Sequence, residues 1–244
     1  MREENGKIII NVSDGKQNYS QRNNEIDPSI TCNTTNMCQA LDYAGWKLPT
    51  DIYPKLSQPE DKLTKFCHED KRVIKYYKEH MPAMYNAWAK GEKDSYPPNE
   101  VHPILAYATN LFLGCSSAVT FHSDYPIKDF LSEVAVNGRP VVTSVKFGSL
   151  GHVITVVGMI FESKEKYDEF MSNQYSSTLY HPESIIYDDT YGKFDFDKLT
   201  YRTYAGASGN DSVMTWDQFI KCCRPEDNTS VKFAHIIGTP AAIN

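Results

Sequence analysis

Apolar residues recur along the whole chain in two different patterns, one typical of strands and the other of helices. Runs rich in β-branched residues, bounded by Gly or Pro, predict strands at 7–12, 140–145, 152–160, 185–187 and 231–237. Apolar residues three and four positions apart predict helices around 71–90, 126–136, 162–176 and 215–223, and a further helix that carries Met37, Ala40, Leu41 and Ala44. Gly45 follows that helix as its stop. Helices mixed with mostly antiparallel strands predict the α+β class.

The same pattern predicts how the chain is organised. A length of 244 residues with 41% hydrophobic residues suits one ordinary core. We therefore expect residues 1–244 to form a single domain with a largely helical insertion at about 46–135. The aromatic stripe in 71–90 has helical spacing, which is more typical of core packing than of a substrate wall.

Charge and the N-terminal residues narrow the range of partners. The net charge is −6 and no long basic run occurs, which argues against a nucleic-acid-binding surface. Residues 1–7 are polar and lead into only three isoleucines, so we expect neither a signal peptide nor a membrane span. These features favour the cytoplasm of the producing cell; a phage-encoded protein that is released or carried in a virion also fits.

Six cysteines are too few for a disulfide scaffold in a chain of this length. They also lack the Cys-x-x-Cys spacing of zinc sites, so we expect free thiols and neither metal nor cofactor. Cys32 differs from the others because it lies in the predicted first turn of a helix, after Thr31 as N-cap. Free backbone N–H groups and the helix dipole favour a thiolate there. Alternatively, Cys32 is a small buried side chain, as expected for Cys38.

Among seven histidines, His152 has the best placement for a base. It follows Gly151 at the mouth of a predicted buried strand, whereas its main rival, His235, lacks both the glycine and an acid downstream. The pair Asp188-Asp189 ends the next predicted strand and can supply an acid that orients an imidazole. Because side chains alternate along a strand, only one of the two can face the histidine. The alternative is that both are turn residues at the surface.

Three parts of the chain resemble papain-like cysteine peptidases related to the bacteriocin-leader-processing domains. The segments are 20–45, 138–160 and 184–237, with Ser20-Gln21-Arg22-Asn23-Asn24, Thr31-Cys32-Asn33-Thr34-Thr35, Gly151-His152-Val153-Ile154 and Tyr187-Asp188-Asp189-Thr190 at their centres. The resemblance implies a papain-like fold with a nucleophile helix packed on the sheet. It also implies Cys32 as nucleophile, His152 as base, Asp189 as orienting acid and Gln21 as oxyanion donor.

Two positions depart from that family pattern. Many relatives have glycine where this chain has Asn33, and the usual Asp-Pro is Asp189-Thr190 here, which leaves Asp188 as a rival acid. Residues 46–135 match no part of the family.

Three classes of function follow from these residues. The first is hydrolysis of a peptide or amide bond through a cysteine thioester, with a peptide or protein substrate such as cell-wall peptide or a precursor. The second is acyl transfer by the same residues, which differs in whether water reaches the thioester. The third is a non-catalytic binding or structural protein on a peptidase scaffold.

Overall fold

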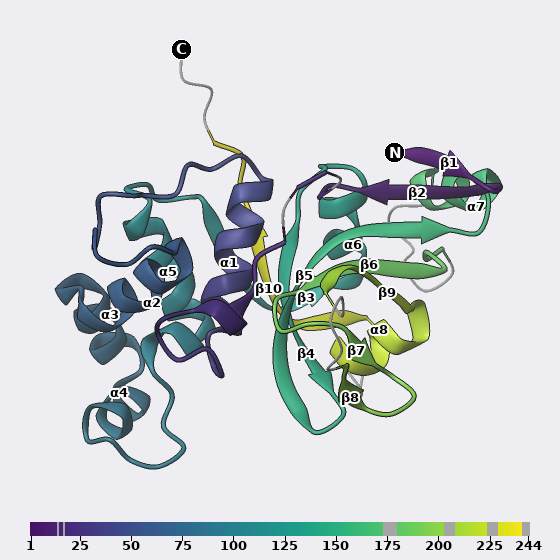
Figure 1. Ribbon diagram of the computed structural model, residues 1–244. Coiled ribbons are helices and arrows are strands. Elements are labelled where there is room, and N and C mark those ends of the chain that lie inside the picture. The colour runs from purple at the N-terminus through teal and green to yellow at the C-terminus, as the bar shows by residue number, and fades with distance from the viewer. Residues whose placement is uncertain (14, 17, 173–179, 203–207, 224–228, 241–244) are drawn as a thin grey trace.

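The computed structural model describes residues 1–13, 15–16, 18–172, 180–202, 208–223 and 229–240 (Figure 1). Its helices are α1 (Cys32–Tyr43), α2 (Pro59–Glu69), α3 (Lys71–His80), α4 (Pro82–Ala89), α5 (His102–Phe112), α6 (Ile127–Ala135), α7 (Lys164–Ser172) and α8 (Trp216–Cys223), with short 3-10 turns η1 (Gln21–Asn23) and η2 (Pro98–Glu100). The strands are β1 (Arg2–Glu4), β2 (Lys7–Asn11), β3 (Val119–Pro126), β4 (Val141–Phe147), β5 (Leu150–Phe161), β6 (Ser184–Asp189), β7 (Phe194–Asp195), β8 (Thr200–Tyr201), β9 (Gly209–Thr215) and β10 (Ser230–Ile237).

Eight of these strands form one sheet in the order β1-β2-β5-β4-β10-β3, and β6 pairs both with β5 and with β9. Every strand pair that the structure describes is antiparallel. The predicted α+β class with a mostly antiparallel sheet is confirmed at this level. The long strand β5 lies at the centre, since it pairs with β2, β4 and β6.

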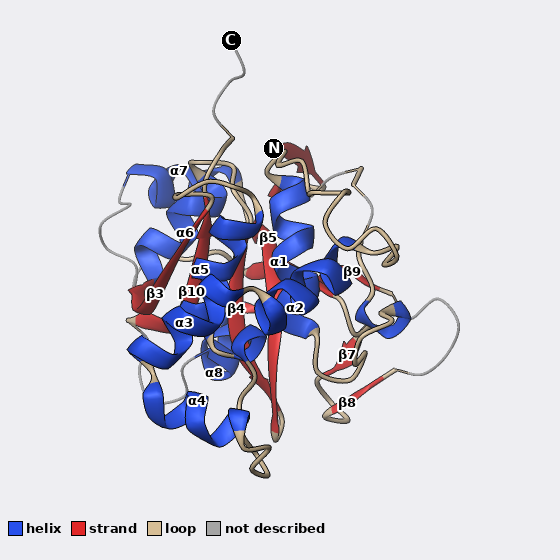
Figure 2. Cartoon of the chain, turned by 90° about the vertical axis from the view of Figure 1, so that its left-hand side faces the viewer, coloured by secondary structure: helices blue, strands red, loops and turns tan. Residues whose placement is uncertain are grey.

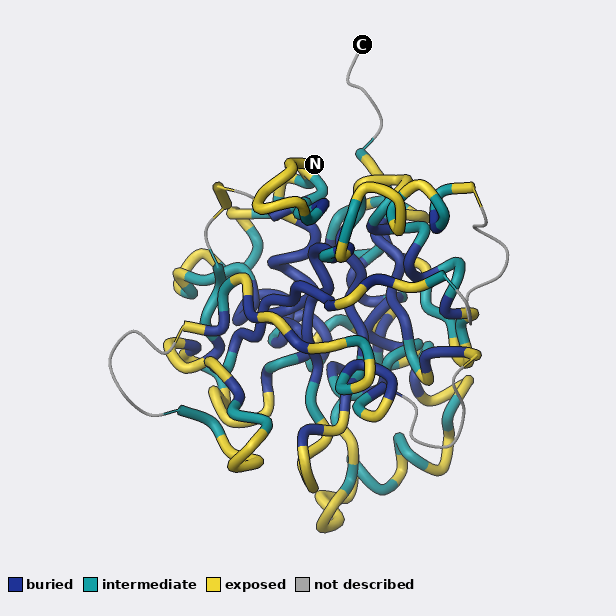
Figure 3. Tube along the Cα trace, turned by 90° about the vertical axis from the view of Figure 1, so that its right-hand side faces the viewer, coloured by how far each residue is buried: buried dark blue, intermediate teal, exposed yellow. Residues whose placement is uncertain are grey.

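Helices cover the two faces of the sheet differently. Helices α1 to α5 gather on one side, in front of the strands in Figure 2, while α6 and α8 lie on the other side. Two hydrophobic clusters match this division, and the alternation of side chains along β5 divides its residues between them: Val153 packs with the α1–α5 cluster, and Ile154 and Val156 with the other. Buried positions accordingly follow the strands in the middle of the molecule (Figure 3).

Helix α1 lies between the other helices and the sheet, and ten of its twelve residues are buried. Met37, Cys38 and Leu41 are fully buried in the α1–α5 cluster, while Tyr43 packs with Val157 of β5. The helix ends where the sequence predicts, and Gly45 follows with a left-handed φ of 87°.

Several predicted elements differ from the structure for identifiable reasons. The 71–90 segment is two helices, because Pro82 begins α4. Asn210-Asp211, a residue pair typical of turns, lies within β9. The 46–135 segment is not only helical, since it also contributes β3 at an edge of the main sheet. Of the helix predicted at 162–176, residues 164–172 are helical and 173–176 lie outside the described residues.

Candidate functional site

Cys32 is the first residue of α1, and its side chain is partly exposed. Thr31 occupies the N-cap position, but its hydroxyl does not cap the helix. It donates instead to the Asp27 carbonyl at 3.2 Å and accepts from Asn24 Nδ2 at 2.8 Å, and these bonds hold the loop before the helix. The first backbone N–H groups of the helix therefore stay available near the thiol, together with the positive end of the helix dipole.

His152 lies on β5 and Asp189 at the end of β6, and their side chains meet. His152 Nε2 is 2.8 Å from Asp189 Oδ1, and the two side chains are 9% and 0% exposed. Because Asp189 bonds to Nε2, Nδ1 is the ring nitrogen left to interact with Cys32, which also raises the pKa of His152. The imidazole thus lies between a thiol and a buried carboxylate.

This arrangement determines the protonation of His152. Burial lowers its pKa, but the charge and hydrogen bond of Asp189, together with those of Cys32, outweigh burial and raise the pKa to about 10. An imidazole with a raised pKa holds a proton at neutral pH, so it can stabilise a thiolate beside it. The pair is chemically suited to ionise Cys32.

Asp189 is held by three further contacts. The Tyr191 backbone N–H donates to Oδ1 at 2.9 Å and the Tyr201 hydroxyl donates to Oδ2 at 3.0 Å. Gly209 of β9 passes so close that a Cβ there would lie 2.0 Å from the Asp189 carbonyl oxygen, and only glycine fits. Gly151 differs, since a Cβ at that position would meet nothing within 4 Å.

Asp188 has a separate structural role. It is fully buried, so the interpretation of the pair as surface turn residues is wrong. Its carboxylate accepts from the Tyr43 hydroxyl at 2.8 Å and from the Asp211 backbone N–H at 2.7 Å. Burial raises the pKa of Asp188 to about 6, although these two hydrogen bonds lower it. Of the two acids, Asp189 is the one that contacts the imidazole.

Asn36, one turn after Cys32 on α1, joins the helix to both strands. Its Nδ2 lies 2.9 Å from the Cys32 carbonyl, 2.8 Å from the Val153 carbonyl and 3.0 Å from Thr190 Oγ1. Its Oδ1 accepts from the Thr155 hydroxyl at 2.9 Å. The neighbours of His152 and of Asp189 are therefore tied to helix α1 through one fully buried amide.

Gln21 belongs to the same hydrogen-bond network, but its bonds in this network are to Thr190 and not to the Cys32 thiol. Its backbone N–H donates to the Thr190 carbonyl at 3.0 Å, and its Oε1 accepts from the Thr190 hydroxyl at 3.2 Å. Its Nε2 donates to the Pro28 carbonyl at 3.0 Å, which uses one of the two N–H groups of the amide. No described hydrogen bond joins Gln21 to Cys32. Thr190, which stands where the family pattern has proline, is the link that brings Gln21 to this place.

The helical part of the chain also supports the site. Asp61 of α2 is fully buried, and its two carboxylate oxygens accept the backbone N–H groups of Glu25 and Ile26, both at 2.9 Å. These residues lie in the loop between Gln21 and Cys32. Asn33, the other departure from the family pattern, accepts from the Cys32 thiol at 3.3 Å and donates to the Asn99 carbonyl at 3.1 Å.

The structure does not bring His235 to this site. It is fully buried on β10, and its Nε2 is 2.9 Å from Nδ1 of His102. Burial and the charges of His102 and His122 lower the pKa of His235 well below its usual range. It contacts a second histidine rather than the orienting acid that a catalytic base needs.

The six cysteines are all free. Cys38, Cys67 and Cys223 are buried, and burial raises the pKa of each. Burial also raises the pKa of Cys222 to about 11. None of these four thiols has an environment that favours its thiolate.

Four residues of the network were missed by the sequence analysis as parts of the site: Asn36, Asp61, Thr190 and Tyr201. Asn36 follows Cys32 by one helical turn, and a polar residue in a buried helix was a usable signal for it. Asp61 is in the first turn of α2, where an acidic residue looks like ordinary dipole complementation. Tyr201 lies on the small β7-β8 hairpin, and nothing local indicates its contact with Asp189.

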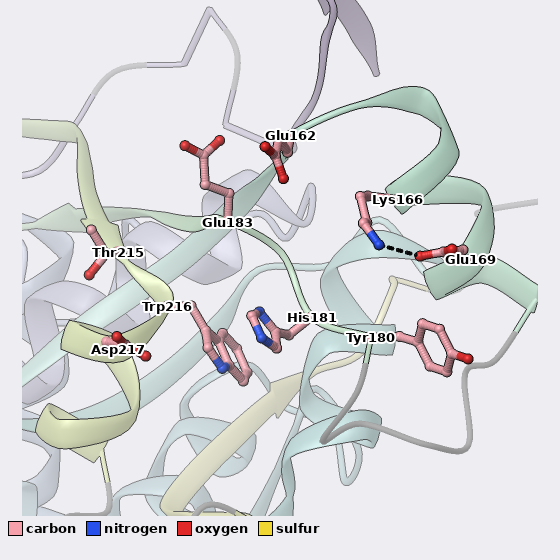
Figure 4. A pocket seen from close by; sticks show the side chains of 9 residues that line it. All are labelled: Glu162, Lys166, Glu169, Tyr180, His181, Glu183, Thr215, Trp216 and Asp217. Carbon is pink, nitrogen blue, oxygen red and sulfur yellow. Dashed lines mark hydrogen bonds and ion pairs between the residues drawn. The ribbon is translucent and has the colours of Figure 1, made fainter.

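A pocket lies at the other end of β6 from Asp189 and contains none of the candidate residues (Figure 4). Its lining consists of Glu162, Lys166, Glu169, Tyr180, His181, Glu183, Thr215, Trp216 and Asp217. His181 and Trp216 stack with ring centroids 4.9 Å apart, and Lys166 pairs with Glu169 at 2.9 Å. This pocket is separate from the Cys32 site.

Among the residues that the structure describes, no group of three or more His, Cys, Asp or Glu side chains is placed to hold a metal ion. No helix among them is long and apolar enough to cross a membrane. Comparisons of the chain with protein-family models, curated proteins and solved structures found no match.

Proposed function

We propose that this chain is a cysteine peptidase or amidase of papain-like fold, which hydrolyses a peptide or amide bond through a thioester on Cys32. The observation that carries the proposal is the position of His152, which bonds through Nε2 to the buried Asp189 and whose pKa is also raised by Cys32 at the start of a helix. A thiol, an imidazole and a carboxylate in this order are the parts of an activated nucleophile.

In the proposed reaction, His152 Nδ1 takes the proton of Cys32, and the thiolate attacks the carbonyl carbon of the substrate. The oxyanion accepts hydrogen bonds from backbone N–H groups at the start of α1 and from the second N–H of Gln21 Nε2. The imidazolium then donates its proton to the leaving amine, which leaves a thioester. Water, deprotonated by His152, resolves the thioester to a carboxylic acid and restores the thiol.

The substrate in this proposal is a peptide or protein, including peptide of the bacterial cell wall. Three features support a peptidase over a scaffold without activity. The buried carboxylate has no ion-pair partner other than His152 among the described residues. The thiol is partly exposed, and Asn36 ties its helix to both strands of the site.

The test combines thiol labelling with peptide cleavage. Limiting iodoacetamide at neutral pH should modify Cys32 before the other five cysteines, because the helix start and the imidazole stabilise its thiolate. A peptide library and purified peptidoglycan, each followed by mass spectrometry, identify the bond cleaved and show whether water or an amine resolves the thioester.

Three variants assign the roles. Cys32→Ala should abolish cleavage, His152→Ala nearly so, and Gln21→Ala should lower the rate by about 10²–10³-fold, as for one oxyanion donor. Asp188→Asn is the matched control for Asp189→Asn. The proposal would be refuted if iodoacetamide modified Cys222 or Cys223 before Cys32. It would also be refuted if the Cys32→Ala variant cleaved the substrate as fast as the wild-type protein.

A further inference from the structure

Arg22 is an exposed residue at the edge of the candidate site, directly after Gln21 in the turn η1. Its guanidinium carbon lies over the ring of Tyr191, 4.5 Å from the ring centroid. Tyr191 donates its backbone N–H to Asp189, and its ring centroid is 6.4 Å from that of His152. One aromatic ring thus separates the guanidinium from the imidazole.

The charge of Arg22 is not neutralised within the described part of the chain, where no carboxylate lies within 4 Å of it. The other described arginines each have a carboxylate partner within that distance: Arg2 with Glu4, Arg72 with Asp70, Arg139 with Glu133 and Arg202 with Asp195.

The two acids that follow Arg22 in the same loop are engaged elsewhere. Glu25 accepts from the backbone N–H and hydroxyl of Ser57, and Asp27 accepts from the hydroxyl of Ser29. Arg22 is therefore a cation without a carboxylate partner among the described residues, in a chain whose net charge is −6.

The way Arg22 is held suits recognition of a carboxylate. A guanidinium that lies over an aromatic ring has one face covered by the ring, while its N–H groups, which lie in the guanidinium plane, stay available for hydrogen bonds. Those N–H groups match the two oxygens of a carboxylate, which they bind side by side. Because the stack limits the motion of the side chain in advance, less conformational entropy is lost on binding.

We propose that Arg22 is a specificity-determining residue that binds a carboxylate of the substrate close to the bond that is cleaved. The distances of 4.5 Å and 6.4 Å, which meet at the Tyr191 ring, limit the separation of guanidinium and imidazole to at most about three residues of extended peptide, which advances roughly 3.3 Å per residue. The carboxylate belongs either to an aspartate or glutamate side chain or to the free C-terminus of a short peptide. This inference rests on the proposed peptidase function and specifies its substrate.

The experiment uses a randomised peptide library whose members carry either a free or an amidated C-terminus. Cleavage by the wild-type protein should favour Asp or Glu over Asn or Gln at one position near the cleaved bond, or free over amidated termini. The first result identifies a side-chain carboxylate and the second a terminal one.

Kinetics on a matched pair of selected peptides then assign the preference to Arg22. For the carboxylate peptide, Arg22→Gln should lower kcat/KM by about 10-fold to 100-fold, mainly through KM, as for loss of one charge-assisted bidentate contact. For the amide peptide the same variant should match the wild-type protein. Arg22→Lys should recover part of this loss on the carboxylate peptide, because the lysine ammonium keeps the positive charge but lacks the side-by-side N–H groups of the guanidinium. Arg2→Gln, at the other end of the sheet, is the control and should change neither peptide's kinetics.

The outcomes separate this inference from the function on which it rests. Equal losses on both peptides, or no preference in the wild-type protein, would refute the role of Arg22 while leaving the peptidase intact. A preference for phosphorylated over carboxylate peptides would also overturn it. Failure of Cys32 to react first with iodoacetamide, together with no cleavage of any peptide, would refute the peptidase, and this inference with it.

Discussion

At the scale of single residues, the protonation state of the His152 imidazole is the central property of the candidate site. Removal from water disfavours the imidazolium, but a buried carboxylate at 2.8 Å and a thiol on the other side favour it more, and the pKa rises to about 10. Asp189 is itself fixed by Tyr191 and Tyr201, so it cannot turn away from the ring. The imidazolium of His152 should therefore persist across the neutral range.

A pH titration tests this directly. In the wild-type protein the NMR signals of the His152 ring should titrate with a midpoint near 10, and kcat/KM should fall above that pH as the imidazolium proton is lost. Asp189→Asn removes the charge that raises the pKa, so both midpoints should move down toward the ordinary value of about 6.5. Asp188→Asn should leave them in place, because Asp188 contacts Tyr43 instead. An unchanged midpoint in Asp189→Asn would contradict this account of the pKa.

At the scale of elements, the site is a junction of one helix and two strands. Helix α1 supplies the thiol, β5 the imidazole and the end of β6 the carboxylate, and Asn36 bonds to all three elements or to their adjacent turn. Removing a buried hydrogen-bonding group leaves its partners unsatisfied, which costs about 1–3 kcal/mol for each. The geometry of the site and the stability of the junction therefore depend on the same amide.

The variant Asn36→Ala should lower the free energy of unfolding by about 3 kcal/mol and slow alkylation of Cys32 at least tenfold. Denaturant unfolding and timed iodoacetamide labelling measure the two effects. Asn110→Ala is the matched control: Asn110 bonds to the N–H and the carbonyl of Val119 with its side-chain amide, far from Cys32. That variant should lose stability but keep the labelling rate. Equal labelling rates in both variants would show that Asn36 is only structural.

The elements that the sequence predicts well are those whose pattern is local. Strands β2, β4, β5, β6 and β10 are continuous β-branched or alternating runs, and α1 has apolar spacing and a glycine stop. Strand β3 was missed because it contains His122, Ser123 and Asp124 and lies at a sheet edge, where polar side chains face solvent. Strand β9 was missed because Asn-Asp is a common turn sequence, yet tertiary pairing with β6 places it in the sheet.

The same distinction applies to the candidate site. Cys32 and His152 could be singled out because a helix start and a strand mouth are local features. The choice of Asp189 over Asp188 depends on a bulge in the pairing of β6 with β9, between Tyr187 and Asp189, which no local pattern contains. The contact of Tyr201 with Asp189 and that of Asp61 with the loop before Cys32 arise only when distant segments meet.

At the scale of the whole molecule, the sheet separates two hydrophobic clusters, and a histidine pair lies against the helical one. His102 of α5 and His235 of β10 share a hydrogen bond and pack against the ring of Phe121. Burial lowers the pKa of His102 to about 4, and burial together with the charges of His102 and His122 lowers the pKa of His235 well below its usual range. Both remain neutral in the folded chain at pH values where an unfolded chain takes up protons on them.

This difference predicts how stability changes with pH. Between about 6.5 and 4 the unfolded state binds more protons at these two histidines, so their contribution to stability falls as the pH falls. Glu60 and Asp188, whose pKa values burial raises to about 7 and about 6, act in the opposite sense over part of this range. The test therefore compares the pH dependence of stability between a variant and the wild-type protein. It does not rely on the slope of stability against pH in the wild-type protein alone.

Replacing one histidine should reduce the acid sensitivity. Denaturant unfolding at pH 7 and pH 5 should show a smaller loss of stability in His235→Gln than in the wild-type protein, by up to about 1.4 kcal/mol per pH unit for one proton. His80→Gln is the control, since His80 is exposed on α3 and should leave the difference unchanged. An identical loss in His235→Gln and the wild-type protein would rule out the histidine pair as a source of acid sensitivity.

The burial of α1 has a consequence for how the chain acquires a reactive thiol. Asn33, Thr34, Thr35 and Asn36 are enclosed although they are polar, and the partners of Asn36 on β5 and after β6 lie more than a hundred positions away. These four polar residues give the start of the helix no apolar side chain that would stabilise it early, and contacts so distant in sequence form late during folding. A nascent or partly folded chain therefore carries Cys32 without its imidazole or its carboxylate. If Cys32 has the proposed role, it becomes reactive only after the sheet has assembled, in molecules whose folding is complete.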